Sequence, residues 1–173
     1  RQLNMISDSQ EIALGVQAAP QFTESYGGAV PSQAVRSYVT EMGGQLANVC
    51  ERPDLPWEFT IVDSSVINAF ALPGGKVFLS RGLADKLTNE AQLAGVIGHE
   101  IGHVTARHTA QRYSAAMATN IGLFGASILG QVFGVPGELN QMAGHFGQLY
   151  LQAYSRHQEL EADMLAVRYM SRA

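Results

Sequence analysis

The sequence predicts a mostly helical fold with one small β-sheet, and three observations support this prediction. Apolar residues recur at helical spacing in several separate segments. The segment from Trp57 to Asp63 instead alternates apolar and polar residues, as a half-buried strand does. A Leu-Pro-Gly-Gly turn at 72–75 separates two further β-compatible runs. Because the 173 residues contain no repeat or low-complexity linker, we expect a single domain over 1–173.

Two helices are predicted before the sheet. Polar residues from Ser7 to Glu11 can cap the first helix, which we expect to stop before Pro20 because proline lacks a backbone N–H. After a loop rich in glycine and proline, Pro31 suits the first turn of a second helix that continues to Cys50. Cys50 is the only cysteine, so an intramolecular disulfide is excluded, and its apolar setting predicts a buried thiol.

The predicted sheet continues from the alternating strand into a hairpin. The runs Asn68–Ala71 and Lys76–Leu79 flank the Pro-Gly turn, so we expect two antiparallel strands. The alternative interpretation is that this hairpin only supports the fold and has no role in binding.

The next helix carries the motif on which the functional argument depends. Thr88 or Asn89 can cap it, with Gln92 as the partner in a capping box, and it runs through the stretch GHEIGH at 98–103. A last helix is expected between 148 and 171, where apolar residues again keep helical spacing.

The composition argues against nucleic acid as the main partner. The net charge is −4, the pI is near 5.7, and lysine and arginine do not cluster. The chain begins at Arg1 without a methionine, so a signal peptide or lipid anchor would already be missing from it.

The stretch from Tyr113 to Gly137 contains no charged residue and is long enough for a membrane span. Polar side chains, several glycines and Pro136 interrupt it, so we favour a buried helix and loop. A flap that touches a membrane or covers the active site is the alternative.

The motif GHEIGH indicates a metal centre. On a helix, His99 and His103 lie one turn apart on the same face, so both imidazoles can bind one tetrahedral ion. Glu100 lies about 100° around the helix from His99, where it can reach a water molecule without binding the ion. The structural alternative, a core helix with two hydrogen-bonded histidines, would bury three polar side chains at a cost unless each finds a partner.

Three glycines beside the histidines predict close contact with another element. Gly95, Gly98 and Gly102 form a stripe, although each costs a helix about 1 kcal/mol relative to alanine. We expect a second backbone element to press against this stripe and to carry the third metal ligand.

A hydrolytic zinc site needs one more protein ligand. The metzincin spacing would require glycine at 106 and histidine at 109, where this chain has Ala106 and Thr109. His108 is one residue out of that register, is expected to turn away from His99 and His103, and is assigned a structural hydrogen bond.

The better third ligand lies in the sequence SRHQELEAD near the end of the chain. Glu159 and Asp163 are four residues apart, so Glu159 can bind the metal while Asp163 accepts a hydrogen bond from a ligand imidazole. Glu161 points about 200° away from Glu159. Spacing alone leaves two alternatives: an exposed acidic helix face without a ligand, or ligation by His145 or His157.

Three motifs, in this order, resemble a known family. They are NAFALPGG at 68–75, the run from EAQL at 90 through HEIGHVTARH at 99–108, and SRHQELEAD at 155–163. The chain is similar to the zinc metallopeptidase family that includes the HtpX heat-shock protease and the CAAX prenyl endopeptidase. Within that family it looks most like the soluble periplasmic branch typified by BepA and LoiP. The resemblance extends from about Ile12 to Ala173.

The resemblance implies a gluzincin-like α+β fold, in which the HExxH helix packs under a small sheet whose edge strand aligns an extended peptide. It implies that His99, His103 and Glu159 hold one Zn²⁺ per chain. It also implies that Glu100 is the general base and that Asp163 supports a ligand histidine.

The family pattern also suggests the substrate cleft. It implies that Asn68, Ala69, Phe70 and Ala71 lie along a cleft for a polypeptide. Family members usually continue beyond the position of Ala173, so the resemblance implies that the far wall of the cleft and a transition-state stabiliser are missing from these 173 residues. Candidates for stabilising the transition state are Arg156, His145, His157 and Tyr154.

The expected activity is zinc-dependent endoproteolysis of unfolded or misassembled proteins, in which Glu100 takes a proton from a zinc-activated water and delivers it to the leaving amine. The alternative is a zinc-stabilised chaperone or envelope-assembly module with latent or little proteolysis. The resemblance implies a location in the bacterial periplasm or cell envelope and a peripheral contact with the membrane or the envelope-assembly machinery.

Overall fold

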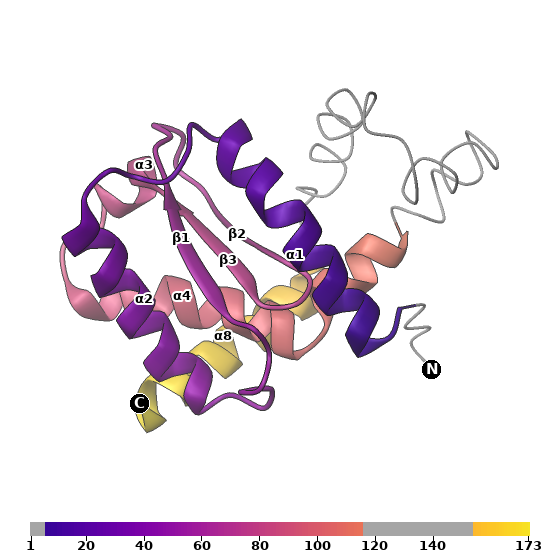
Figure 1. Cartoon of the computed structure of the whole chain (residues 1–173). Helices are drawn as coiled ribbons and strands as arrows, with labels where there is room; N and C mark the ends of the chain where they lie inside the picture. The colour runs from indigo at the N-terminus through magenta and orange to yellow at the C-terminus, as the bar shows by residue number, and fades with distance from the viewer. Residues whose placement is uncertain (1–5, 116–153) are drawn as a thin grey trace, which may run out of the picture.

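A computed structural model describes residues 6–115 and 154–173 (Figure 1). Helices provide most of the ordered elements and three strands form one sheet, which confirms the predicted α+β class. The elements in chain order are α1 (Asp8–Ser25), α2 (Gln33–Asn48), β1 (Glu58–Val62), β2 (Ala69–Leu72), β3 (Lys76–Ser80), α3 (Arg81–Ala84), α4 (Glu90–Thr105) and α8 (Arg156–Arg172).

The sheet has the strand order β1-β3-β2. β2 and β3 pair antiparallel, which confirms the predicted hairpin, whereas β1 pairs with β3 in parallel. Gly74 and Gly75 have φ values of 81° and 87°, so the turn uses the left-handed conformation that glycine adopts most easily. A Cβ at Gly74 would also lie 2.8 Å from the carbonyl oxygen of Glu11, which leaves no room for a side chain.

Helices cover both faces of the sheet (Figure 1). On one face, Ala19 and Phe22 of α1 pack in a cluster with Phe70 and Phe78, whose rings stack at 4.9 Å. On the other face, α2 and α4 share a second apolar core with β1 and β3. α8 packs on α4, so α4 is held by neighbours that include the sheet, α2 and α8. This arrangement fixes the orientation of the helix that carries GHEIGH.

The expectation that the first helix stops before Pro20 was wrong. α1 continues through Pro20 to Ser25. Proline removes one helical hydrogen bond, to the carbonyl of Val16, but Val16 is 55% exposed, so water can reach that turn. Burial of Ala19 and Phe22 on either side of the proline favours continuation of the helix.

A buried ion-pair network joins α1 to the end of α4. Glu11, which the sequence suggested only as a capping residue, is fully buried. Arg52 donates to both of its carboxylate oxygens at 3.0 Å, and Arg107 lies 3.5 Å from Oε2. Arg52 also donates to the carbonyl of Val104 at 3.2 Å. The network therefore anchors the last turn of α4.

The two helices of the motif regions begin at capped ends. Asn89 accepts from the N–H of Gln92 at 3.0 Å and so caps α4. The side chain of Gln92 accepts from Thr88 at 2.7 Å. α8 begins with a capping box in which Ser155 is extended, so this helix starts at Arg156 and not near 148.

Most of the charge-free stretch from Tyr113 to Gly137 lies outside the described residues, as do residues 148–153 of the expected last helix. Residues 108–115 are helical. Among the helices that the structure describes, none is long and apolar enough to cross a membrane.

Candidate metal centre

The two histidines of the motif converge on one point. His99 and His103 project from the same face of α4, and their Nε2 atoms lie 3.0 Å apart. The rings are nearly perpendicular, at 82°, with centroids 4.6 Å apart. The Nδ1 atoms of both rings are used elsewhere, so the Nε2 atoms are the ones available to a shared ligand.

The glycine stripe is the contact surface between α4 and α8. A Cβ at Gly98 would lie 3.3 Å from Ala166, and one at Gly102 would lie 3.0 Å from the carbonyl oxygen of Ala162. Gly95 is more open, with Met170 sulfur at 3.8 Å from such a Cβ. These distances confirm that another backbone element presses against the stripe.

This close approach brings Glu159 to the histidines. Its Oε2 lies 3.1 Å from Nε2 of His99, and its Oε1 lies 3.7 Å from Nε2 of His103. One donor atom from each of the three residues lies within 4.8 Å of the other two. These are the three residues that the family resemblance implied as ligands, and the structure brings their donor atoms close together.

The spacing of these atoms suits a small divalent ion. Ligands at about 2.0–2.1 Å in a tetrahedron lie about 3.3 Å from one another. The separations of 3.0, 3.1 and 3.7 Å in the structure bracket that value. Two imidazole nitrogens and one carboxylate also form a donor set that zinc accepts, with a fourth position open.

Each histidine has a partner at its other ring nitrogen. Nδ1 of His99 lies 2.8 Å from Oδ1 of Asp163, as expected from the spacing of Asp163 and Glu159. Nδ1 of His103 lies 2.9 Å from Nδ1 of His108, and Nε2 of His108 lies 3.1 Å from Oε2 of Glu161.

The expected orientation of His108 needs a correction. We expected a structural hydrogen bond, which it makes, but also that it would turn away from the ligand face. α4 ends at Thr105, and Arg107 then has a φ of 61°, so the chain changes direction before His108. This break returns His108 to His103, and extrapolation of a regular helix could not reveal it.

Glu100 is buried beside the three residues and is only 7% exposed. Burial raises the pKa of its carboxyl to about 7, and nearby Glu159 acts in the same direction, while His99 and Arg112 oppose the shift. Glu100 is not part of the group of three donors. Its position next to the donors and its raised pKa are typical of a group that exchanges protons.

Burial also determines the protonation state of His103. Removal from water lowers the pKa of its imidazole to about 2, and His99, His108 and Arg112 add to the shift. A neutral ring is the form that binds a metal, so His103 is in a binding-competent state near neutral pH.

Tyr154, one of the candidates for stabilising the transition state, packs directly against His103, a contact that the sequence did not predict. Its ring stacks on His103, with centroids 3.8 Å apart and planes at 18°. The guanidinium of Arg112 lies 3.2 Å from the ring centroid on the same tyrosine. Within the described part of the chain its buried hydroxyl has no hydrogen-bond partner. The spacing of residues in the sequence could not reveal this contact with His103, because it depends on how the chain packs before α8.

The other predicted residues lie as follows. Arg156 and His157 are exposed in the first turn of α8, whereas His145 lies outside the described residues. Cys50 is buried in the core between the sheet, α2 and α4, as predicted. Ala69–Ala71 belong to β2, which has β3 on one side and forms an edge of the described sheet.

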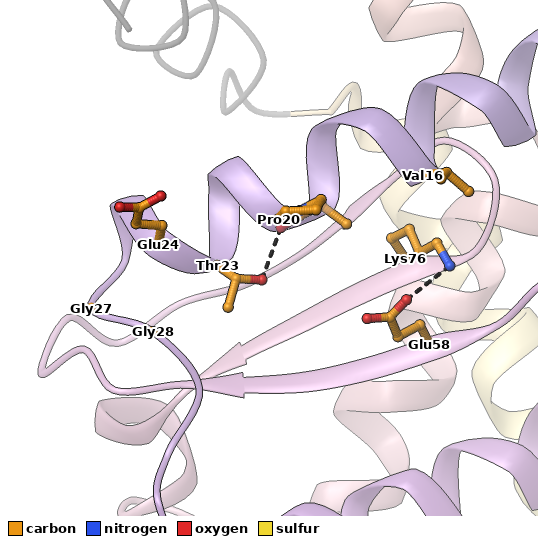
Figure 2. Close-up of a pocket in the computed structure, with 9 residues that line it drawn as sticks. Val16, Pro20, Thr23, Glu24, Gly27, Gly28, Glu58 and Lys76 are labelled. Carbon is orange, nitrogen blue, oxygen red and sulfur yellow. Dashed lines mark hydrogen bonds and ion pairs between the residues drawn. The ribbon is translucent and has the colours of Figure 1, made fainter.

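A separate hollow of about 740 Å³ lies beside α1 (Figure 2). Figure 2 shows the Lys76–Glu58 ion pair, with N···O at 2.9 Å, next to α1. None of the three donors or Glu100 lines this hollow, so it is not the metal centre. Its lining residues are Val16, Ala19, Pro20, Thr23, Glu24, Gly27, Gly28, Glu58 and Lys76.

Comparison with known proteins agrees with this geometry. The family description "Peptidase family M48" matches residues 33–173. The chain belongs to peptidase family M48. It is 32% identical to the mitochondrial metalloendopeptidase OMA1 of Schizosaccharomyces pombe over 177 residues, which cover 100% of this chain and 50% of that protein.

Two bacterial proteins are also similar to this chain. The β-barrel assembly-enhancing protease of Yersinia pestis is 30% identical over 175 residues, covering 97% of this chain and 35% of that protein. The Escherichia coli K12 protein of the same name is 31% identical over 145 residues, covering 79% and 29%. The chain therefore spans half or less of the length of these relatives.

Proposed function

We propose that this chain is a zinc-dependent endopeptidase, with residues 1–173 as a single metallopeptidase domain. The observation that carries the proposal is the convergence of His99, His103 and Glu159 beside the buried Glu100. Membership of peptidase family M48 supports the same class of activity.

The proposed metal ligands are the Nε2 atoms of His99 and His103 and the carboxylate of Glu159. When bound, the ion supplies Lewis-acid chemistry, because it polarises a carbonyl and makes a water molecule more acidic. Asp163 accepts a hydrogen bond from Nδ1 of His99 and so keeps its Nε2 directed toward the centre.

Glu100 is proposed as the general base. Its carboxylate takes a proton from the attacking water and transfers it to the nitrogen of the leaving amine, as general acid–base catalysis requires. Its pKa near 7 places the exchange close to neutral pH. A cation beside Glu100 favours the ionised carboxylate, which is the form that accepts the proton.

The edge strand β2 is the proposed site of polypeptide binding. An extended peptide can add to an exposed sheet edge through backbone hydrogen bonds. The side chains of Phe70 and Ala71 are buried in the two cores, so they are not the side chains that would contact a peptide. Asn68 precedes the strand and Ala69 is partly exposed, so these two offer side-chain contacts.

Two residues stay as candidates for stabilising the transition state. Arg156 is a cation in the first turn of α8, three residues before Glu159. Tyr154 has a buried hydroxyl and lies against His103. We propose that one of these groups assists the oxyanion, and single substitutions that lower kcat without lowering zinc content would identify it.

A chaperone or envelope-assembly module with little proteolysis is the second candidate. It is favoured by the similarity to proteins named for enhancing β-barrel assembly. A cell-envelope location and a peripheral envelope contact belong to this proposal and remain predictions, since other relatives carry mitochondrial names.

Incubation with a disordered substrate such as casein tests the two candidates. The endopeptidase proposal predicts cleavage that a chelator abolishes and that stoichiometric zinc restores. Binding of casein without cleavage at any zinc concentration would contradict it and support the assembly module. Metal analysis of the same preparation is expected to give one equivalent of zinc per chain, and less in Glu159→Ala.

A further inference from the structure

The two histidines of the metal centre differ in the partners of their Nδ1 atoms, which are the ring nitrogens that face away from the centre. The side chain of His99 is 23% exposed and its Nδ1 faces Asp163 directly. The side chain of His103 is 1% exposed, so water has little access to it. A buried ring nitrogen needs a protein partner, and for His103 that partner is His108.

The contacts define one direction of hydrogen bonding. With Nε2 of His103 directed at the metal, its proton resides on Nδ1 and is donated to Nδ1 of His108, 2.9 Å away. His108 then carries its own proton on Nε2 and donates it to Oε2 of Glu161, 3.1 Å away. The terminal carboxylate accepts and needs no further proton.

We propose that His108 and Glu161 are positioning residues that hold His103 in the tautomer and orientation that bind the metal. This inference rests on the proposed function of the centre. α8 therefore contributes three side chains to the metal centre. Glu159 is the proposed ligand, and Asp163 contacts Nδ1 of His99. Glu161 contacts His108, which in turn contacts His103.

The backbone supports the same role. The turn after α4 places His108 against His103, and Arg107 in that turn donates to the carbonyl of Ile6 at 2.8 Å and pairs with Asp8. Glu161 is 42% exposed on its side chain, so its substitution does not leave a large core cavity. It is therefore the better residue for a test that must keep the fold.

The test is the zinc affinity of the purified chain, measured by competition with a chromophoric chelator. Loss of such supporting hydrogen bonds typically weakens metal binding by about 10–100-fold. We expect a loss in this range for His108→Ala and for Glu161→Ala, and a smaller loss for Glu161→Gln, whose amide oxygen still accepts from His108. Glu41→Gln, which removes an exposed glutamate on α2, is the matched control and is expected to bind as the wild type does.

A double-substitution cycle separates this role from general stabilisation. Because both residues act through one chain of hydrogen bonds, Glu161→Ala is expected to cost little further affinity once His108 is alanine. The cobalt-substituted protein provides a second readout, since a reoriented His103 changes its visible absorption spectrum. Additive losses in the double variant would contradict the proposed chain.

The outcomes distinguish this inference from the proposed function. Wild-type protein that binds no zinc would overturn the metal centre itself. Wild-type protein that binds one zinc, together with a folded Glu161→Ala that keeps wild-type affinity and an unchanged cobalt spectrum, would overturn the positioning role alone. If His108→Ala fails to fold, Glu161→Ala and Glu161→Gln still decide the question.

Discussion

The roles of single residues depend on which atom of each side chain faces the centre. The Nε2 atoms of His99 and His103 face each other and Glu159, while their Nδ1 atoms contact Asp163 and His108. If each Nε2 binds a metal, the ring proton of each histidine resides on Nδ1, which then donates to Asp163 or to His108. Glu100 stays outside the donor group and is available for proton transfer.

Substitution of Glu100 separates binding from catalysis. Glu100→Gln keeps the shape of the side chain but removes the base, so casein cleavage is expected to fall by at least about 100-fold. Zinc content is expected to stay at one equivalent, because Glu100 is not one of the three ligands. A Glu100→Gln protein with wild-type cleavage at full zinc content would contradict the assignment of Glu100 as the base.

At the residue scale, local spacing predicted most of the centre. His99 and His103 are four residues apart, as are Glu159 and Asp163. Because both pairs lie within regular helices, each pair shares one helix face, as its spacing predicted. The partnership of His108 with Glu161 was missed because it depends on where α4 ends and on the distant packing of α8.

At the scale of elements, the contact between α4 and α8 sets the geometry of the centre. The small residues at this contact, Gly98, Gly102, Ala162 and Ala166, bring the two backbones together. Glu159 reaches the histidines only because α8 lies this close. The glycine stripe was readable in the sequence, whereas the parallel pairing of β1 with β3 was not, because strand order is a non-local property.

A larger side chain at this contact is expected to weaken metal binding. In Gly102→Leu, even the Cβ would lie 3.0 Å from the Ala162 carbonyl oxygen, so α8 must move away. We expect zinc affinity to fall by about 10-fold or more, as for other losses of ligand support. Gly95→Ala is the matched control: it has room and is expected to keep zinc affinity and to stabilise α4 by up to about 1 kcal/mol. Unchanged affinity in a folded Gly102→Leu protein would refute this account of the stripe.

The junction of α2, α4 and α8 is expected to respond to acid through Glu51. Burial alone would raise the pKa of Glu51, but hydrogen bonds from Tyr169 and Arg168 outweigh it and hold the pKa below its ordinary value. A carboxyl with a depressed pKa in the folded state stabilises the protein above the unfolded pKa and loses that contribution as pH falls through the folded value. Thermal unfolding followed from pH 6 to pH 3 is therefore expected to show a shallower loss of stability in Glu51→Gln. Identical acid dependence in the two proteins would exclude this role.

At the scale of the whole molecule, α1 closes the face of the sheet opposite α4 (Figure 1). It contributes Ala19 and Phe22 to the apolar cluster with Phe70 and Phe78 on that face, and Glu11 to the buried ion pairs. The sequence predicted a helix here but not its passage through Pro20 or the burial of Glu11. The burial of Glu11 depends on Arg52, and the passage through Pro20 depends on the packing of Phe22 against Phe70 and Phe78; all of these partners lie far along the chain.

Removal of Arg52 is expected to destabilise the whole fold. Arg52→Ala leaves the carboxylate of Glu11 buried without its main partner, and breaking a buried pair in this way costs about 3–5 kcal/mol. Denaturant unfolding of the metal-free protein measures the change. Asp8→Ala removes an exposed partner in the same network and is expected to cost about 1 kcal/mol or less. Similar losses for the two variants would show that the buried pair has no special role.

His99, His103 and Glu159 are together proposed to bind one zinc ion. Anomalous diffraction at the zinc edge, from crystals of the zinc-loaded protein, tests this proposal most directly. We predict a single peak about 2.0–2.2 Å from both Nε2 atoms and from one carboxylate oxygen of Glu159. A peak elsewhere, or a peak at this position with Glu159 turned toward solvent, would contradict the account.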